Sequence, residues 1–287
     1  MKILFCSDGS NLCYEAINNF TNWFKKFDAD ILCVANIHTL PEGFVLEIPE
    51  FESRCQNSVK EILNHSKDHL DSLKIETKKL IKGCGGTVDY ILETEKKGKY
   101  DYIVLGSNGK IGIQKWLGSI SQEVASKCKS SIYISKGKNN LRDITFAFNT
   151  ECDYSPELEK MITEINFGEK NIHLITVFKI PEYMFLEGNI DKRWIKDIEK
   201  KQIKLSLNKL AHYERIFRQH NIKITNSLTI KGNYEEEILK YSKNNKIDLI
   251  VCPVYKQNNN KTLPASFKKI LEHCSTDIII LKDFENL

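Results

Sequence analysis

The sequence has no C-x-x-C pair, although it contains nine cysteines among 287 residues. We therefore expect neither a disulfide framework nor a thiolate metal site, and we read the cysteines as small buried hydrophobic residues in reduced surroundings. The chain also lacks an uninterrupted apolar run of roughly 20 residues, the length that spans a bilayer, and it shows no signal-peptide pattern. These absences predict a cytoplasmic protein with no membrane partner.

Neither sign of charge dominates, since 42 Lys and Arg residues stand against 38 Asp and Glu residues. No basic stripe interleaved with aromatic residues is present, so nucleic acid is not an expected partner. Hydrophobic residues make up 41% of the chain, which suits a globular protein of up to two domains. Composition thus excludes a disordered or fibrous chain.

What the sequence does contain is an internal repeat. Ile3-Leu-Phe-Cys-Ser-Asp8 aligns with Ile144-Thr-Phe-Ala-Phe-Asn149 at an offset of 141 residues, and the apolar run 31–34 aligns with 172–175 at the same offset. Three later matches have offsets of 149, 147 and 146 residues: 81–83 with 230–232, 100–104 with 247–251, and 126–132 with 272–278. Five matches in one order predict two copies of one structural unit.

Each copy alternates Ile-rich and Val-rich runs with stretches of helical period, a pattern typical of βαβ units around a parallel sheet. In copy one we expect strands near 2–7, 31–37, 75–81, 101–106 and 131–135, and a first helix over 12–27. Copy two repeats the order with a longer second helix, near 191–219. The prediction is α/β: two tandem, open, doubly wound, five-stranded parallel-sheet domains at 1–138 and 141–287, with a polar linker at 136–140.

Two segments of copy one follow strands at the carboxyl edge of the predicted sheet, where such sheets bind ligands. In Ser7-Asp8-Gly9-Ser10, Asp8 ends the first strand and Ser10 is suited to cap the next helix. The second segment, 106–121, is a glycine-rich loop that enters a helix at Ser119. Its glycines leave backbone N–H groups unshielded, and the helix N-terminus adds unpaired donors and partial positive charge. This loop therefore suits a polyphosphate.

Side chains near the loop add to this chemistry. Ser119 and Ser121 supply hydroxyl donors, and Lys110 and Lys115 bring positive charge. The Asp8 carboxylate would repel phosphate, but it can accept hydrogen bonds from ribose hydroxyls or an adenine amine. The two segments therefore suit opposite ends of one nucleotide.

The strand followed by Asp8-Gly-Ser10, the glycine pattern before the last helix and the short final strand together resemble the universal stress protein family in its tandem form. The resemblance extends over both copies through the repeat, but its specific motifs lie within 1–137. It implies an adenine nucleotide alpha hydrolase-like fold and a stress-response or regulatory role. It also implies binding of ATP, AMP or ADP, with or without Mg, at these positions: Asp8, Asn36, Gly106, Gly109, Gly118, Ser119 and Ser121.

The resemblance further implies how the copies associate. Family members pair their domains through the last strands, which predicts a pseudo-two-fold contact between 132–134 and 278–280 within the chain, with a homodimer of the whole molecule as a further step. The sequence departs from the family in one respect, because members that bind ATP usually have one residue more than the eight between Gly109 and Gly118. The deletion would re-aim the loop amides and weaken binding.

Copy two lacks these features. Asn149 stands in place of Asp8, Glu151 stands at the position of Ser10, and no glycine occurs between Pro253 and Ser266. Side chains would cover the amides in that loop, and prolines have no N–H donor. We therefore expect a structural or interaction role for the second copy.

Catalysis beyond slow ATP hydrolysis is not expected, because no Ser-His-Asp or Cys-His pattern and no general base beside the loop can be recognised. An alternative from another class is a ligand-free interaction module whose shortened loop excludes phosphate. A third reading is an enzyme that acts on adenylated substrates, as related doubly wound sheets do, but the extra catalytic segments it would need are absent from the sequence.

Overall fold

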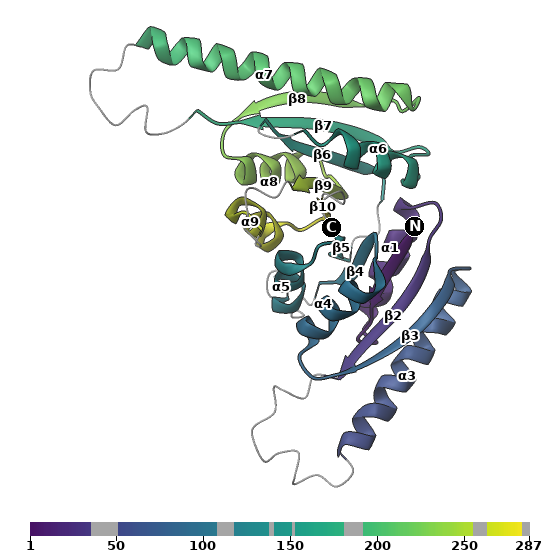
Figure 1. Ribbon diagram of the computed structural model, residues 1–287. Helices are drawn as coiled ribbons and strands as arrows, with labels where there is room; N and C mark the ends of the chain where they lie inside the picture. Colours follow the sequence, from purple (N-terminus) through teal and green to yellow (C-terminus); the bar gives the residue numbers. More distant parts are fainter. Residues whose placement is uncertain are drawn as a thin grey trace.

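The computed structural model describes residues 1–35, 51–107, 118–137, 141–150, 153–180, 192–254 and 263–282. Its strands form one ten-stranded sheet in the order β3-β2-β1-β4-β5-β10-β9-β6-β7-β8 (Figure 1). Neighbouring strands are parallel except for β5 and β10, which pair antiparallel. The sheet therefore consists of two five-stranded parallel units that meet at their last strands, as predicted.

The elements alternate between strand and helix along both units. The first unit contains β1 (Lys2–Cys6), α1 (Asn11–Trp23), β2 (Asp28–Ala35), α3 (Phe51–Ser72), β3 (Glu76–Cys84), α4 (Thr87–Gly98), β4 (Tyr102–Gly106), α5 (Ser119–Lys127) and β5 (Ser131–Ser135). The second unit contains β6 (Asp143–Asn149), α6 (Ser155–Glu164), β7 (Asn171–Phe178), α7 (Lys192–Gln219), β8 (Asn226–Lys231), α8 (Tyr234–Asn244), β9 (Leu249–Val254), α9 (Ala265–His273) and β10 (Asp277–Lys282). The predicted order and the longer second helix of copy two are confirmed.

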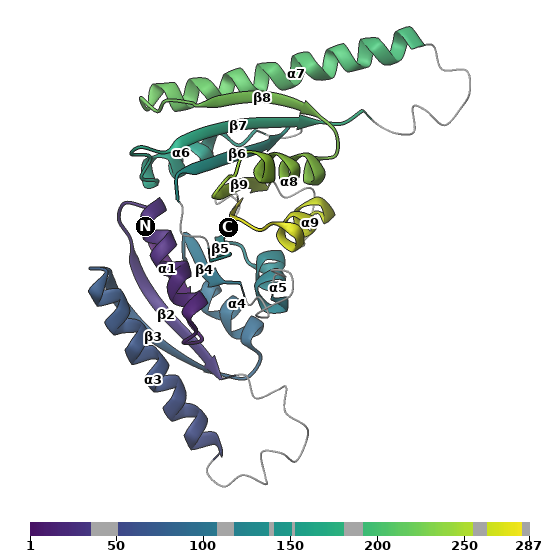
Figure 2. The same ribbon diagram turned by 180° about the vertical axis from the view of Figure 1, so that it is seen from behind.

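Helices cover both faces of the sheet (Figures 1 and 2). Side chains of α1, α3, α6 and α7 share one buried apolar cluster with one face of the strands, and those of α4, α5, α8 and α9 share the other. Successive strand residues alternate between the clusters: Phe5 faces the first and Leu4 the second, as the strand period of two requires. Each cluster runs through both units, so the two halves have continuous cores.

The junction of the units is the predicted contact between final strands. Ile278 pairs with Ile134 and Ile280 pairs with Ile132 in antiparallel register. The segment predicted as a linker begins inside this junction, because Lys136 is only 2% exposed. The backbone N–H of Lys136 donates to an Asp277 carboxylate oxygen at 2.7 Å. Residues 138–140 of that segment lie outside the described residues.

The first helix is shorter than its apolar pattern predicts. It ends at Trp23, and Phe24 has extended backbone that forms an antiparallel bridge with Ile165 of the second unit. The N–H of Lys25 donates to the carbonyl of Glu164 at 3.0 Å. Pairing across the units therefore ends the helix, while the apolar side chains that follow it still pack in the core.

The alignment of the copies also needs correction. Phe5 pairs with Ile31 in the first unit, and its counterpart Phe146 pairs with Leu174 in the second, so Ile31 corresponds to Leu174 rather than Ile172. The match of 81–83 with 230–232 is likewise displaced by two residues. Ile81 pairs with Leu32, and Leu228 pairs with Ile175, the counterpart of Leu32, so Ile81 corresponds to Leu228. A shift of two residues keeps each side chain on its face of the strand, so the apolar pattern alone cannot detect it.

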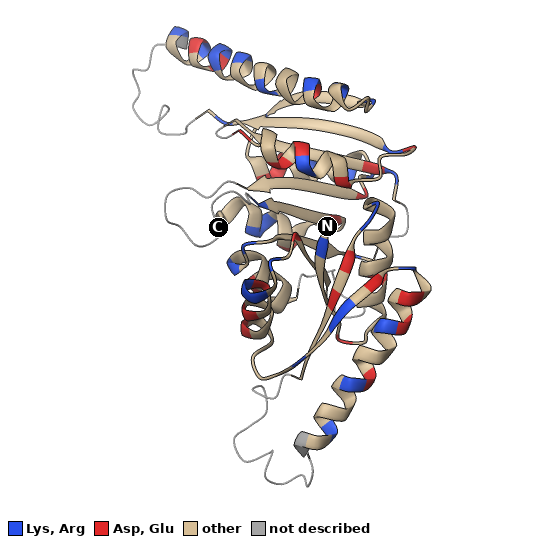
Figure 3. Ribbon diagram, turned by 45° about the vertical axis from the view of Figure 1, so that its right-hand side comes forward, with Lys and Arg blue, Asp and Glu red and all other residues tan. Residues whose placement is uncertain are grey.

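Charged residues lie along the outer faces of the long helices α3 and α7, which stand at opposite ends of the molecule (Figure 3). The two helices are in corresponding positions of the two units. Within the described part of the chain, no helix combines the length and the apolar character needed to cross a membrane.

Candidate functional site

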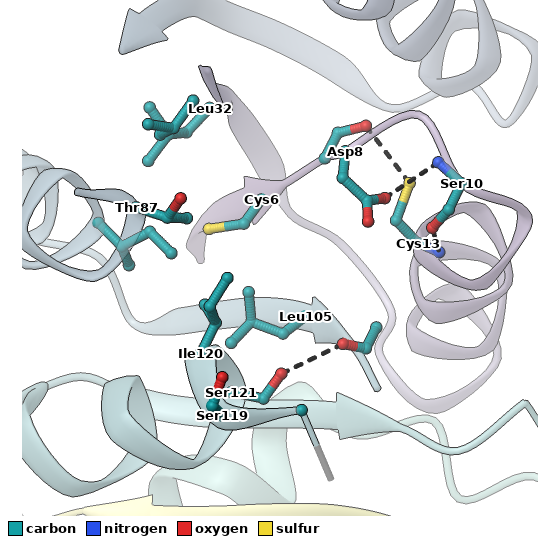
Figure 4. Close-up of a pocket in the computed structure, with 15 residues that line it drawn as sticks. Cys6, Asp8, Ser10, Cys13, Leu32, Thr87, Leu105, Ser119, Ile120 and Ser121 are labelled. Atoms are coloured by element: carbon teal, nitrogen blue, oxygen red, sulfur yellow. Dashed lines mark hydrogen bonds between the residues drawn. The ribbon is translucent and has the colours of Figure 1, made fainter. Parts of the chain in front are cut away.

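A cavity of about 320 Å³ lies at the carboxyl edge of the first unit (Figure 4). It is next to the switch point between β1 and β4, from which the strand order runs in both directions, and its volume is in the range of small-molecule sites. Strand ends and the N-terminal ends of α1, α4 and α5 surround it. The lining residues are Cys6, Ser7, Asp8, Ser10, Cys13, Leu32, Val34, Thr87, Ile91, Leu105, Gly106, Gly118, Ser119, Ile120 and Ser121.

The turn after β1 presents Asp8 to this cavity. Gly9 has a φ of 74°, in the left-handed region that favours glycine, and a Cβ there would lie 3.1 Å from a side-chain carbon of Ile62. One oxygen of the exposed Asp8 carboxylate accepts a hydrogen bond from the N–H of Ser10 at 3.0 Å. Ser10 in turn caps α1 by accepting from the N–H of Cys13, as predicted. The turn thus fixes the Asp8 backbone and keeps its side chain at the surface.

Ser7 holds this turn from below. Its hydroxyl is within hydrogen-bonding distance of the Ser66 hydroxyl of α3, at 2.7 Å, and of the Cys13 thiol, at 3.3 Å. Its N–H donates to the carbonyl of Leu32 at 2.9 Å. One buried serine therefore ties the end of β1 to α1, β2 and α3, so the position of Asp8 depends on the packed core.

The N-terminal end of α5 supplies amides on another side of the cavity. Gly118 is the N-cap residue and provides no side-chain cap, and the first helical bond runs from the N–H of Gln122 to the Gly118 carbonyl at 3.2 Å. Among the described residues, none accepts from the backbone N–H groups of 119–121. Such amides and the helix dipole favour an anion. The Ser121 hydroxyl donates to the carbonyl of Gly106 at 3.3 Å, which joins the helix to the end of β4.

Gly106 has a packing role that the sequence did not reveal. A Cβ at this position would lie 2.9 Å from the backbone oxygen of Leu12 in α1. The glycine therefore lets the first turn of α1 approach the end of β4. By contrast, Gly118 has φ −62° and ψ 145°, a conformation open to any residue, so the backbone there does not require glycine.

The inner wall of the cavity is apolar and its thiols are neutral. Burial raises the pKa of Cys6 and Cys13 above the ordinary thiol value. Burial also raises the pKa of Cys33, to about 11, with a further contribution from the negative charge of Asp8. A thiolate is the reactive form of cysteine, so none of the three acts as a nucleophile at neutral pH. Cys6 and Cys13 line the cavity, and Cys33 lies in the buried apolar cluster.

The model of the Universal stress protein family matches residues 1–136, the half of the chain that contains this cavity. This half belongs to the universal stress protein family. A universal stress protein of Methanocaldococcus jannaschii is 28% identical over an alignment of 143 residues, and the match covers 47% of this chain and 81% of that protein.

Solved universal stress proteins share the fold of the whole chain. A crystal structure of a universal stress protein from Archaeoglobus fulgidus has a TM-score of 0.67 and 15% identity, and the match covers 100% of this chain and 97% of that one. A structure of a universal stress protein from Pseudomonas aeruginosa, described as putative, has a TM-score of 0.66 and 9% identity, with 98% and 92% covered. At such identity the likeness shows the fold alone, which is that of a two-unit universal stress protein.

The structure brings most of the predicted universal stress protein positions to one cavity. Asp8, Gly106, Gly118, Ser119 and Ser121 all line it. Asn36 and Gly109 lie outside the described residues, as do Lys110 and Lys115.

The sequence reading missed the contribution of α4. Thr87 and Ile91 line the cavity from this helix, which begins after the third strand. The signal is present in Gly85 and Gly86, which follow β3 at the same edge of the sheet, whereas the predicted site residues come from the ends of strands one, two and four. Because the carboxyl ends of parallel strands share one edge, the third loop belongs to the same search.

The second unit has different chemistry at the corresponding edge. Asn149 ends β6 where the first unit has Asp8 two residues after β1, and Pro264 is the N-cap residue of α9 where Gly118 precedes α5. Pro253 lies within β9 at the position of Gly106. Neither proline has an N–H to donate. Glu151 lies outside the described residues, and so do residues 255–262 of the loop between β9 and α9.

Proposed function

We propose that the first unit, residues 1–138, binds an adenine nucleotide and that the protein serves as a stress-response regulator. The observation that carries the proposal is one cavity with the Asp8 carboxylate and the amides of 119–121 at separate parts of its wall. The amides suit phosphate oxygens, and the carboxylate suits ribose hydroxyls or an adenine amine. Leu32, Val34 and Ile91 supply apolar surface for the base.

Membership of residues 1–136 in the universal stress protein family supports the same reading. We propose ATP as the first nucleotide to test, with ADP and AMP beside it and with and without Mg. Residues 141–287 are proposed to form a second domain with a structural or interaction role. Asn36 and Gly109 remain proposed ligand contacts together with the five residues that line the cavity.

Thermal unfolding in the presence of ATP tests the proposal. A ligand that binds only the native state stabilises it by about 2.7 kcal/mol when its free concentration is a hundred times the dissociation constant. We expect millimolar ATP to raise the melting temperature of the full chain. Gly118→Val should abolish this rise, because the new side chain would stand beside the α5 amides while the backbone conformation at 118 tolerates it.

Ala265→Val is the control, because Ala265 begins α9 directly after Pro264, the counterpart of Gly118. The control should retain the full rise with ATP. If ATP does not change the melting temperature of the unmodified protein, with or without Mg, the nucleotide proposal fails and a ligand-free interaction module becomes the better reading. If both variants lose the rise, the assignment of binding to the first unit alone is wrong.

A further inference from the structure

The two units differ at the residue that begins the helix after their third strand. The N–H of Gly85 donates to the last carbonyl of β2, and the N–H of Gly232 donates to the last carbonyl of β7, so these glycines have the same place in the two units. Two residues later, Thr87 begins α4 and Tyr234 begins α8. Thr87 lines the cavity (Figure 4). Tyr234 is therefore the counterpart of Thr87 in the second unit.

From that position Tyr234 extends to the end of β6. Its hydroxyl donates to the carbonyl of Ala147 at 2.6 Å, and its ring centroid is 5.4 Å from that of Phe267. Strand register and helix starts show that Ala147 and Phe267 correspond to Cys6 and Ser121, which line the cavity of the first unit. The two aromatic side chains therefore lie among the counterparts of the cavity walls.

The size of the Tyr234 and Phe267 side chains determines how much of this space they occupy. Phe267 is buried, with 3% of its surface exposed, and it belongs to the same apolar cluster as Cys252 of β9. An aromatic side chain covers roughly 150–250 Å² of surface when buried, far more than the serine and threonine at the equivalent places of the first unit can cover. The bond from Tyr234 to Ala147 also fixes the ring against β6.

We propose that Tyr234 and Phe267 fill, in the second unit, the space that is open in the first, and that the small side chain of Thr87 determines which unit admits a ligand. The space filled by Tyr234 and Phe267 does not depend on the glycines that the second unit lacks, because both side chains would remain if the loop between β9 and α9 were replaced. The role of Thr87 in admitting a nucleotide rests on the proposed function. The filling of the second unit does not.

Cys252 reports on the filling without any nucleotide. Its side chain is buried in the second unit, and its counterpart Leu105 lines the cavity of the first. We expect iodoacetamide to modify Cys252 about tenfold faster or more in the variant Tyr234→Thr, Phe267→Ser than in the unmodified protein, because a buried thiol otherwise reacts only when the structure opens. Peptide mass mapping assigns the modified cysteine.

Tyr234→Phe is the control for this measurement, since it keeps the ring and loses only the hydroxyl, which bonds to Ala147 and to the thiol of Cys252. It should leave the rate close to that of the unmodified protein. Circular dichroism shows whether the double variant folds. If it does not, the rate of Cys252 modification is measured in Tyr234→Thr alone. An unchanged Cys252 rate in a folded Tyr234→Thr variant would overturn the proposed filling.

The role of Thr87 is tested with ATP. Thr87→Tyr should weaken ATP binding by about tenfold or more, a change of about 1.4 kcal/mol or more, as measured by calorimetric titration of the full chain. Thr87→Leu provides a smaller obstruction where the tyrosine variant does not fold. Ala265→Tyr, which places the same ring at the exposed start of α9, should bind like the unmodified protein.

Each outcome of these measurements decides one point. Undiminished ATP binding by folded Thr87→Tyr overturns the role of Thr87. If the unmodified protein does not bind ATP, the proposed function fails, and the alkylation rates still decide whether Tyr234 and Phe267 fill the second unit.

Discussion

His173 is a buried titratable residue of the second unit, with 7% of its surface exposed on β7. Its Nδ1 lies 2.8 Å from the hydroxyl of Tyr241, and its Nε2 lies 3.5 Å from a carboxylate oxygen of Asp143. Burial lowers the pKa of His173, and the bond and charge of Asp143 oppose this effect without reversing it. The imidazole is therefore held in its neutral form by the fold.

The sign of this shift predicts how stability depends on pH. Because the unfolded chain binds the proton more tightly, the contribution of His173 is complete above a pH of about 6.5 and is lost as the pH falls toward the lower pKa of the folded state. Each unit of pKa difference is worth about 1.4 kcal/mol. His173→Gln should therefore make stability less dependent on pH between about 7 and 5, as measured by urea unfolding.

The control for this prediction is His65→Gln, since His65 is exposed on α3. It should reproduce the pH dependence of the unmodified protein. Equal slopes for the His173 variant and the control would show that protonation of His173 is not coupled to folding.

Helix α5 is held at both ends by features outside the helix. Its N-terminal amides face the cavity, while its C-terminal carbonyls receive the ammonium group of Lys282 from the end of β10. Lys282 donates to the carbonyl of Ala125 at 2.8 Å and to that of Cys128 at 2.6 Å, and only 9% of it is exposed. A cation at this end complements the helix dipole. The second unit therefore supports the helix that carries the proposed anion site.

Lys282→Met tests this support. The methionine keeps most of the apolar stem but leaves two carbonyls without their donor, so we expect a loss of about 2 kcal/mol in the free energy of unfolding. Hydrogen exchange should show faster opening of α5 than in the unmodified protein. Lys129→Met, which alters an exposed lysine just beyond the same helix, should change stability by less than about 0.5 kcal/mol.

At the scale of the whole molecule, one carboxylate gathers polar groups from both units. Asp277 is fully buried at the start of β10. It accepts hydrogen bonds from the side chains of Tyr133, Ser135 and Asn19 and from the N–H of Lys136. All four donors belong to the first half of the chain, so this network specifies how the halves meet.

Asp277→Ala should destabilise the whole chain rather than one unit. A buried donor left without its acceptor costs about 1–3 kcal/mol, so the loss of several bonds should lower the free energy of unfolding by about 3 kcal/mol or more. Chemical denaturation followed by circular dichroism measures the loss. Asp68→Ala, at an exposed position of α3, should have little effect. A loss no larger than that of the control would show that the network does not hold the junction.

Much of the fold could be predicted because its signals are local. Apolar runs mark the strands of both copies, and the shared order of segments is sufficient to identify the repeat. The same reasoning placed Asp8 and the residues 118–121 at one edge, since parallel strands end together. The sequence pattern assigns Gly106 a role only in ligand binding. Its close approach to Leu12 depends on where α1 packs along β4, which neither segment alone predicts.

The duplication, the two parallel units and the edge of the sheet that carries the ligand chemistry can be predicted from the amino-acid sequence alone, because periodicity and backbone chemistry are properties of short segments. The strand register, the end of α1 at Trp23 and the contrast between Thr87 and Tyr234 become visible only in the folded chain. These features depend on contacts between segments far apart in the chain. A shift of two residues leaves the strand pattern unchanged, so only the paired neighbour shows which side chain reaches the cavity.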